Sequence, residues 1–573
     1  MPPPLAARAQ PLPAPHYSPP PGPYYHPALH PDGIINLTTA ENSLLSDRLL
    51  GHLSRPIQYH EQHLKYRVAL TKSALPSLDD LLPEYINDHF APRVRVTREN
   101  SLVGPGIGAI LAQLVWALAG EGEGVLMTNP FYDDYVRDIT HPARVRLLCP
   151  AVPATVDPLG PGVLPLLERA IVWSNGPAPR FNTGQTSDSD SDDAVREGEG
   201  DMRTRIKVLF LTNPHNPLPR VVGADVVRGY AQLAEKYDLH LIVDEVYALS
   251  TFSLSLYPPT EAAEFRSILC YDVQNEWGVD PARVHVLTGP TKDLGCSGLK
   301  AALLTTPNLT LLARLRPLFG ATPPSAVSDA LLSRVLSDKP FVARFLEDNR
   351  EELRQAYERV ARWAEGHGLG FTRANAGVYV LVDFAPWLVR LPAENGNGIN
   401  ILNGVHVSGN GVYANGNGAH VNGYTAHVNG KGMACTSTEM VNGKNGVYGK
   451  HANGTYTNGN GTYTNGNGTY TNGNGTYTNG NGKHANGAHA LKGKAVVSSE
   501  DVRAAFDPAV RATLDRAVAA MLREGVFLKP TSLSGDPIPT RFRVVFSHPR
   551  ATIELALRRI EKAFGMPPLP FED

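Results

Sequence analysis

Cysteine is scarce in this sequence, which has 4 among 573 residues. None of the four follows the paired spacing of zinc ligands, and a chain of this length does not need disulfides in order to fold. We therefore predict reduced thiols and no metal site. The four cysteines are Cys149, Cys270, Cys296 and Cys435.

The sequence also lacks an excess of charge of either sign and any long apolar run. Lysine and arginine number 53 and aspartate and glutamate 55, so the basic excess that nucleic-acid binding requires is missing. No stretch approaches the roughly 18 apolar residues of a membrane helix, and the N-terminal residues contain no apolar signal segment. We expect a cytoplasmic protein whose partner is a small molecule, with no nucleic acid and no membrane.

Three segments contain too few apolar residues to build a packed core. Residues 1–30 are rich in proline, and residues 173–205 include an acidic, serine-rich run. Residues 394–494 are dominated by asparagine and glycine and include four near-copies of the unit Gly-Thr-Tyr-Thr-Asn-Gly-Asn. We predict a disordered leader, a disordered insertion and a low-complexity repeat insertion. A β-solenoid is the alternative for the repeat, but its units lack a regular branched apolar residue to stack.

The rest of the chain alternates between strand-like and helix-like patterns. Its strand-like segments are short, apolar and β-branched, as is typical of strands buried on both faces. Apolar residues at helical spacing predict a crossover helix at residues 224–237. We predict an α/β fold with a mainly parallel sheet in a large domain of residues 31–310, and a smaller α+β domain from residues 311–393 and 495–573. The strand-like segments of the large domain are Gly124–Thr128, Ile206–Leu211, His240–Val243 and Arg283–Leu287.

Three polar clusters directly follow three of these strands. They are Asn213–Pro217, Asp244–Tyr247 and Thr291–Gly295. The carboxyl ends of parallel strands meet at one edge of a sheet, and ligands bind there. Taken singly, the clusters have ordinary explanations as a turn, a helix cap and a solvated loop. Their common position after strands makes them candidates for a binding site.

In this order and spacing, the three clusters resemble the fold-type I aminotransferases of class I and II, including the 1-aminocyclopropane-1-carboxylate synthases. The resemblance implies a pyridoxal 5'-phosphate cofactor, which Lys292 holds as a Schiff base before it acts as a general base on the substrate. It places Asp244 at the pyridine nitrogen, Asn216 and Tyr247 at the phenolic oxygen, and Tyr132 against the ring face. Lys292, Asp244 and Tyr247 are therefore the expected catalytic residues.

The phosphate of the cofactor is where the sequence departs from the family pattern. Pro105 removes a backbone N–H group from the expected phosphate loop, and Gly289 replaces a serine. Lys300 replaces an arginine, so it keeps the charge but loses the bidentate fork. We expect weaker cofactor binding or a phosphate that is held differently. Besides the residues named above, the resemblance assigns Gly104, Gly106, Thr291 and Lys300 to cofactor binding.

For the substrate, the resemblance assigns the α-carboxylate to Arg543, in the strand-like segment Arg541–Phe546, because a planar guanidinium suits a bidentate contact. A rim salt bridge is the competing explanation. Ala40 and Glu41 resemble a segment of the aminocyclopropane synthase branch that lies beside the substrate, although a helix cap also explains this glutamate. Tyr66 resembles the tyrosine that one subunit of a homodimer donates to the other.

These residues predict an enzyme that acts on an α-amino acid, with amino-group transfer as the leading reaction. The first alternative is α,γ- or β-elimination, including carbon–sulfur cleavage, because both reactions begin with the same carbanion. The second alternative is a degenerate, non-catalytic binding protein that has kept Lys292 and Asp244, which the altered phosphate loop would explain.

Overall fold

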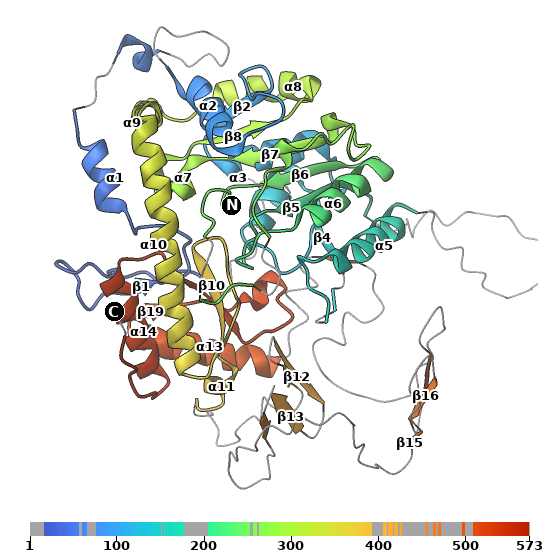
Figure 1. Cartoon of the computed structure of the whole chain (residues 1–573), viewed down its shortest axis with the longest axis vertical. Coiled ribbons are helices and arrows are strands. Elements are labelled where there is room, and N and C mark those ends of the chain that lie inside the picture. Colours follow the sequence, from blue (N-terminus) through green and yellow to red (C-terminus); the bar gives the residue numbers. More distant parts are fainter. Residues whose placement is uncertain are drawn as a thin grey trace, which may run out of the picture. The chain divides into compact units, whose positions relative to one another are not determined.

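In a computed structural model of the chain, the contacts between residues divide the protein into two units. The first unit consists of residues 1–399 and 493–573, and the second of residues 400–492. Figure 1 draws the described residues in colour. The structure describes residues 17–56, 60–65, 76–150, 152–153, 155–176, 204–252, 256–259, 263–391 and 508–571, together with short strands between residues 405 and 498.

An eight-stranded sheet forms the centre of the first unit, in the order β18-β4-β3-β5-β6-β7-β8-β2. Neighbouring strands from β4 through β7 are parallel, whereas β8 and β18 pair antiparallel with their neighbours. The strands are β2 (Ser101–Gly104), β3 (Gly124–Leu126), β4 (Arg146–Pro150), β5 (Ile206–Thr212), β6 (His240–Asp244), β7 (Val284–Thr288), β8 (Ala302–Thr305) and β18 (Val496–Ser498).

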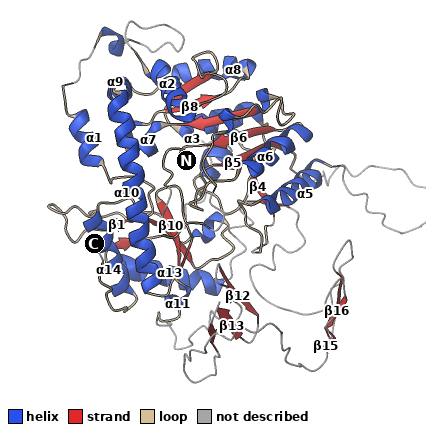
Figure 2. Ribbon diagram, viewed as in Figure 1, coloured by secondary structure: helices blue, strands red, loops and turns tan. Residues whose placement is uncertain are grey.

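Helices pack on this sheet because its central strands are apolar on both faces. All residues of β3 and β7 are buried. Helices α5 (Leu164–Asn175) and α6 (Ala224–Lys236) share one apolar cluster with β5 and β6, and α6 contributes Val226, Val227 and Tyr230 to it. Figure 2 shows these strands enclosed among the helices of the large domain. The predicted α/β fold with a mainly parallel sheet is confirmed, and the four predicted strands and the crossover helix match within two residues at each end.

The direction of the strands decides where polar side chains gather. Strands β3, β5, β6 and β7 are parallel, so they end at the same edge of the sheet. The segments that follow β5, β6 and β7 are the three polar clusters of the sequence. Each cluster therefore begins at this edge, as the alternation of strands and helices predicted.

The smaller domain is built on an antiparallel sheet of β20 (Arg541–Val545), β10 (Tyr379–Asp383) and β9 (Gly370–Phe371). Helices α13 (Pro508–Arg523) and α14 (Arg550–Ala563) belong to the same domain. The 28-residue helix α10 (Lys339–Gly366) runs from α9 (Ala326–Ser337) to this domain and connects the two halves of the unit (Figure 1).

Two segments at the edges of the predicted domains have defined partners. Strand β1 (Ile35–Asn36) pairs parallel with β19 (Val526–Phe527), and before it the hydroxyl of Tyr17 donates to Asp515 at 2.6 Å. Part of the segment that we assigned to a leader thus contacts the smaller domain. Strand β18 extends the large sheet by pairing with β4. Residues 1–16 and most of the acidic insertion, residues 177–203, lie outside the described residues.

The described strands of the second unit form antiparallel hairpins. One set follows the order β11-β12-β13-β14 and the other β15-β16-β17, and all their pairings are antiparallel. A β-solenoid would instead stack parallel rungs. The remainder of the repeat insertion lies outside the described residues. The strands are β11 (Val405–Ser408), β12 (Gly411–Asn415), β13 (Gly418–Val421), β14 (Tyr424–Ala426), β15 (Gly454–Thr455), β16 (Thr462–Asn465) and β17 (Gly468–Thr471).

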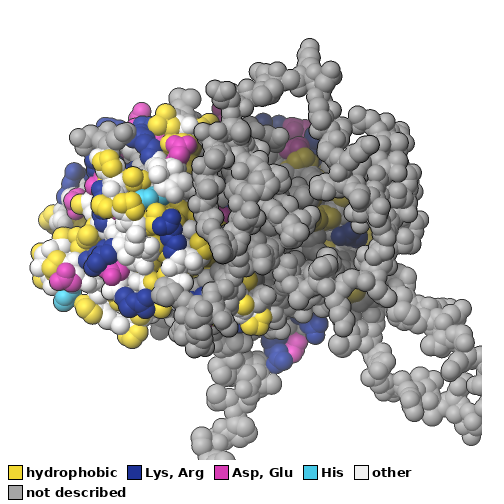
Figure 3. Space-filling model, turned by 90° about the horizontal axis from the view of Figure 1, so that it is seen from below, with side chains coloured by type: hydrophobic (Ala, Val, Ile, Leu, Met, Phe, Trp, Pro, Cys, Tyr) yellow, Lys and Arg dark blue, Asp and Glu magenta, His cyan; other side chains and the backbone are white. Residues whose placement is uncertain are grey.

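Surface polarity agrees with the balanced composition. On the face drawn in Figure 3, acidic and basic side chains are interspersed among the coloured atoms, and they form no large patch of one sign there. Within the described ranges, every helix is too short or too polar to cross a bilayer.

Candidate functional site

Lys292 lies where the chain leaves the central sheet. It belongs to the short helix α7 (Pro290–Asp293), which begins two residues after β7 ends. Its Nζ donates a hydrogen bond to the carbonyl oxygen of Ala40, so the N-terminal segment reaches the lysine from 252 residues away in sequence. Gly295 turns the chain in the left-handed region (φ +66°), and a Cβ there would come within 2.3 Å of the Asn42 carbonyl oxygen. The segment around Ala40 is therefore packed directly on the lysine loop.

The surroundings of Lys292 make its amine unusually acidic. Burial lowers the pKa of Lys292 to about 8, and the nearby cations Arg543 and Lys300 act in the same direction. Glu41 and Asp244 oppose this shift. At pH 7 roughly one such amine in ten is neutral, compared with fewer than one in a thousand for an ordinary lysine. A neutral amine is a nucleophile and a base, so this position suits covalent chemistry.

Asp244, at the end of β6, is a buried carboxylate with two hydrogen-bond donors. The Tyr135 hydroxyl donates to Oδ2 at 2.6 Å, and the backbone N–H of Val246 donates to Oδ1 at 3.1 Å. Burial raises the pKa of Asp244 to about 6, while both donors and Lys292 oppose that rise. A carboxylate in such a place favours a cationic ligand group, because neutral donors only partly replace the lost water.

Tyr135 is a site residue that the sequence did not single out. It lies three positions after Tyr132, and its buried hydroxyl is also 3.2 Å from the Thr212 hydroxyl. The two tyrosine rings meet edge to face with centroids 5.2 Å apart. A Tyr-x-x-Tyr pair after Asn129-Pro130 is the only sequence signal, and it equally describes a core tyrosine.

We predict that Tyr135→Phe weakens cofactor retention by about 10- to 100-fold, because a hydrogen bond to a charged group contributes roughly 1.5–3 kcal/mol. Equilibrium dialysis against pyridoxal 5'-phosphate measures the dissociation constant. Tyr237→Phe is the matched control, because the Tyr237 hydroxyl donates to Glu168 at 2.8 Å away from the site. An unchanged dissociation constant in Tyr135→Phe would show that Asp244 does not depend on this donor.

Arg543 joins the smaller domain to the site from β20. It is 5% exposed and donates to Asn216 Oδ1 at 2.9 Å and to the Thr38 carbonyl oxygen at 2.6 Å. Its guanidinium lies 5.9 Å from the centroid of the Tyr132 ring and 5.3 Å from that of Tyr379. In the part of the chain that the structure describes, no carboxylate pairs with this guanidinium. The buried position of Arg543 does not favour a rim salt bridge, the competing explanation for this residue.

Tyr247 is held by a second tyrosine that the sequence did not reveal. Its ring meets Tyr379 edge to face, with centroids 5.6 Å apart at 87°. The Tyr379 hydroxyl donates to the His215 carbonyl oxygen at 3.0 Å. Burial raises the pKa of Tyr247, so its hydroxyl stays protonated and can donate to an anionic oxygen.

The predicted phosphate loop opens α3 (Ile107–Leu118), whose N-cap Gly106 has φ +104°. A Cβ at Gly106 would lie 3.7 Å from Cδ of Lys300, which places this lysine at the loop. Gly104 instead has a packing role, since a Cβ there would come within 2.5 Å of the Ile110 side chain. A carboxylate oxygen of Asp138 lies 2.7 Å from the point that a Cβ of Gly108 would occupy. The N-terminus of α3 thus lies close to both a lysine and an acid from other segments.

Of the remaining predicted site residues, three lie near Lys292 and one falls outside the described residues. Ala40 contacts Lys292 directly, and Thr291 precedes it in α7 and is partly buried. Glu41 is exposed and close enough to Lys292 to influence its pKa. Tyr66 lies outside the described residues, so its predicted role in a second subunit stays a prediction.

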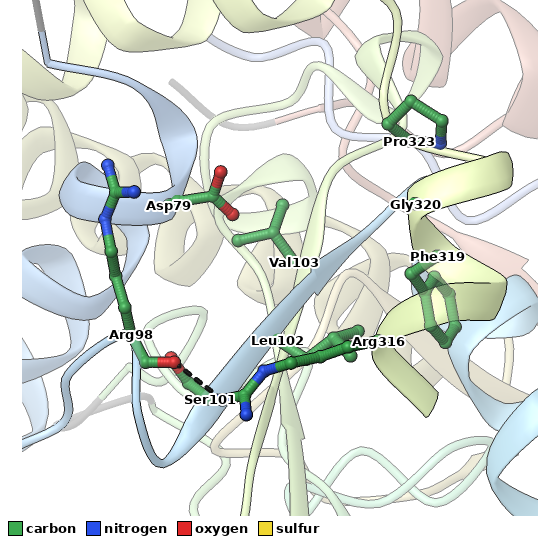
Figure 4. A pocket seen from close by; sticks show the side chains of 9 residues that line it. All are labelled: Asp79, Arg98, Ser101, Leu102, Val103, Arg316, Phe319, Gly320 and Pro323. Carbon is green, nitrogen blue, oxygen red and sulfur yellow. Dashed lines mark hydrogen bonds between the residues drawn. The ribbon is translucent and has the colours of Figure 1, made fainter. Parts of the chain in front are cut away.

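A separate pocket lies between the edge strand β2 and α8 (Leu309–Ala321). Its two arginines already have partners: Arg98 donates to Asp80, and Arg316 donates to the Arg98 carbonyl oxygen at 2.9 Å (Figure 4). None of the predicted site residues lines it. The lining residues are Asp79, Arg98, Ser101, Leu102, Val103, Arg316, Phe319, Gly320 and Pro323.

Comparison with known proteins agrees with this geometry. The family model of aminotransferases of class I and II matches residues 168–404. "Probable aminotransferase gliI" of Aspergillus fumigatus is 28% identical over 357 residues, which are 60% of this chain and 73% of that protein. The 1-aminocyclopropane-1-carboxylate synthase-like protein 1 of Bos taurus is 26% identical over 364 residues, 63% of this chain and 65% of that protein. The resemblance that the three motifs carried is confirmed.

Solved structures show the same fold at low sequence identity. An aspartate aminotransferase from Thermus thermophilus with maleate is 15% identical with a TM-score of 0.51, and the match covers 93% of this chain and 92% of that one. An aspartate aminotransferase from Rhodobacter sphaeroides is 14% identical with a TM-score of 0.52 and the same coverage. The chain has the fold of these enzymes.

Enzymes of this family use pyridoxal 5'-phosphate, and the residues present fit that group. Asp244 is a buried carboxylate that a protonated pyridine nitrogen would satisfy. Oδ1 of Asn216 accepts a hydrogen bond from Arg543, so the NH₂ group of Asn216 can donate to a phenolic oxygen. For the phosphate, the chain offers the N-terminus of a 12-residue helix and Lys300, although Asp138 adds a negative charge nearby.

Proposed function

We propose that this chain is a pyridoxal 5'-phosphate-dependent enzyme that acts on an α-amino acid by transferring its amino group. The observation that carries the proposal is the environment of Lys292. Its amine follows a central strand, has its pKa lowered to about 8, and interacts electrostatically with both Asp244 and Arg543. A solvated loop lysine, the ordinary explanation, would have none of these properties.

The catalytic roles follow from where each side chain lies. When bound, the cofactor supplies an electron sink for negative charge at the substrate Cα. Lys292 would hold the cofactor covalently, and its Nζ would accept the α-proton of the substrate. Asp244 would keep the pyridine nitrogen protonated, and Tyr132 would pack against the ring. Tyr247 and Asn216 would donate to the phenolic oxygen.

Arg543 binds the substrate α-carboxylate in this proposal. The guanidinium is anchored by Asn216 and Thr38 and has no carboxylate partner among the described residues. Its remaining donors can therefore pair with an incoming carboxylate without first breaking an ion pair. Because Arg543 also touches Asn216, substrate binding and cofactor binding share one hydrogen-bonded unit.

Elimination is the second candidate reaction, favoured by the N-terminal segment. Ala40 accepts a hydrogen bond from Lys292, and Glu41 lies near the same amine. A carboxylate beside the lysine can influence where the proton goes after it leaves Cα, and so can favour loss of a substituent over transfer. The similarity to 1-aminocyclopropane-1-carboxylate synthase-like proteins points the same way.

A degenerate, non-catalytic protein is the third candidate. Its support is the phosphate loop, because Pro105 and Gly289 depart from the family pattern and Asp138 interacts electrostatically with Lys300. One similar mouse protein bears the name "Probable inactive 1-aminocyclopropane-1-carboxylate synthase-like protein 2". The residues assigned to the cofactor ring argue against this candidate. A binding protein does not need a lysine with a lowered pKa beside a buried carboxylate. We also propose a homodimer, in which Tyr66 serves the site of the second subunit.

Titration of the purified protein with pyridoxal 5'-phosphate and then with a panel of amino acids tests the proposal. We expect a visible absorbance band that amino acids perturb. A keto acid and an aminated acceptor identify transfer, whereas ammonia, a thiol or a cyclised amino acid identifies elimination. Glu41→Gln should shift the ratio of these products more than it changes substrate affinity. A band that no amino acid perturbs would favour the non-catalytic candidate.

A further inference from the structure

An ion pair joins the two domains beside Tyr132. Lys529, which follows β19 in the smaller domain, lies 2.5 Å from the carboxylate of Asp133 in the large domain. The side chains are 20% and 13% exposed, so the pair is mostly shielded from water. A shielded pair is screened less by salt and holds its geometry better than a surface pair does.

Neighbouring contacts fix this pair next to the carboxylate-binding arginine. The backbone N–H of Phe131 donates to the Ser534 carbonyl oxygen at 3.0 Å, and the Asn129 side chain donates to the Gly535 carbonyl oxygen at 2.7 Å. The loop that carries Asp133 is therefore attached on one side to the smaller domain. Tyr132 directly precedes Asp133 in the sequence, and the centroid of its ring lies 5.9 Å from the Arg543 guanidinium.

The electrostatics show that Asp133 is charged and neutralises Lys529. Burial alone would raise the pKa of Asp133, but Lys529 and Arg543 together hold it below its ordinary value. Beside it, Asp134 accepts a hydrogen bond from the Tyr132 hydroxyl at 2.6 Å. Asp133 therefore lies close enough to Arg543 to interact with its guanidinium, and the cation beside Asp133, Lys529, already has an anionic partner.

We propose that the Asp133–Lys529 pair makes this site select α-amino acids that carry a single carboxylate and reject those with an acidic side chain. The inference rests on the proposed function, since it presumes that Arg543 binds the α-carboxylate. A second carboxylate that approaches Lys529 finds this cation already paired with Asp133. To use Lys529 it must displace Asp133, which leaves that acid in a shielded place among other acids, and this is a repulsive device of the kind that sets specificity.

The same selection extends to the amino acceptor. An oxo acid binds in the same place as the amino acid that it becomes. A dicarboxylic oxo acid therefore encounters the same Asp133–Lys529 pair. The acceptor class that fits is a monocarboxylic oxo acid. If the enzyme instead eliminates, no acceptor is needed and the selection falls on the amino acid alone.

Spectral titration with L-glutamine and L-glutamate tests the inference, because the two differ in one charge at nearly equal size. We expect the unmodified holoenzyme to bind glutamate at least 10-fold more weakly than glutamine. Asp133→Asn frees Lys529, so it should improve glutamate binding about 10-fold and leave glutamine within threefold. Lys529→Met removes the cation and keeps the acid, so the preference for glutamine should persist.

Glu168→Gln is the control for a change in net charge, because Glu168 pairs with Lys236 at 2.6 Å on the outer helices. It should leave the glutamine-to-glutamate ratio unchanged. Equal affinities in the unmodified holoenzyme, or an unaltered ratio in Asp133→Asn, would overturn the inference while leaving the proposed function intact. If neutral amino acids also fail to perturb the cofactor band, the proposed function itself fails. The comparison in the unmodified protein decides the matter even if a variant does not fold.

Discussion

Lys292→Ala should abolish the covalent attachment of pyridoxal 5'-phosphate and lower the turnover of any amino acid by at least about 10⁴-fold. Only Lys292 among the predicted site residues is an amine at the carboxyl end of a central strand that also neighbours Asp244. Removing it deletes both the covalent anchor and the group that moves the α-proton, and losses of this size are typical when groups that act as a unit are removed.

Borohydride reduction followed by peptide mapping measures the attachment directly. The unmodified protein should yield one modified peptide that contains Lys292. Lys236→Ala is a suitable control, because Lys236 is paired with Glu168 on the outside of the fold. If Lys292→Ala gave the cofactor adduct in unchanged yield, Lys292 would not be the residue that holds the cofactor.

The pH dependence of this attachment follows from the same surroundings. Only the neutral amine attacks the cofactor aldehyde, and burial has lowered the pKa of Lys292 to about 8. The rate of attachment to the cofactor-free protein should therefore rise as the pH increases and level off above about 8. An ordinary lysine would continue to gain rate up to about 10.4. Stopped-flow absorbance in a pH series gives the curve.

The fold and the central residues could be predicted from the sequence because each left a local signal. Strands buried on both faces are apolar runs, and the residues that follow them are forced to one edge of the sheet. Asp244 and Lys292 are visible because a carboxylate or an amine directly after such a run needs an explanation. Three such positions in one order are enough to indicate a shared site.

The partners of these residues could not be predicted in the same way, because they are contacts across long distances in the chain. Tyr135 meets Asp244 across 109 positions, and Lys529 meets Asp133 across 396. A tyrosine in an apolar environment or a lysine before a proline has many ordinary explanations. Only the packing of the two domains selects which one applies, and one sequence contains no direct record of that packing.

The edges of the predicted domains could not be located from the sequence for a related reason, and β18 joins the large sheet although we assigned its residues to the smaller domain. Strand β18 follows the repeat insertion and adds to the large sheet, although its three residues carry too short a pattern to show which sheet they join. Tyr17 likewise lies in a proline-rich segment, and its contact with Asp515 depends on a single hydroxyl. Composition identifies segments that cannot build a core, but it does not exclude that they dock onto one.

Arg543→Lys should raise the amino-acid concentration for half-saturation by about 10- to 100-fold, which corresponds to roughly 1.5–3 kcal/mol for a charged hydrogen bond. The guanidinium already donates to Asn216 and to the Thr38 carbonyl oxygen. It still has donors for both oxygens of a carboxylate, because its five N–H groups are fixed in one plane. A lysine amine has three donors and cannot hold both anchors and the substrate in that geometry.

Arg541→Lys is the matched control, because Arg541 lies on the same strand and pairs with Asp536 at 3.7 Å. Half-saturation should be unchanged in this control, and the absorbance of the bound cofactor should be unchanged in both variants. The measurement that isolates the carboxylate contact compares the affinity for each amino acid with the affinity for its decarboxylated amine. Arg543 can favour the amino acid only through the carboxylate, so the preference should shrink in Arg543→Lys and persist in Arg541→Lys. If the unmodified enzyme binds amino acids and amines equally well, Arg543 does not bind the carboxylate, and its role reduces to holding Asn216 and the Thr38 segment in place.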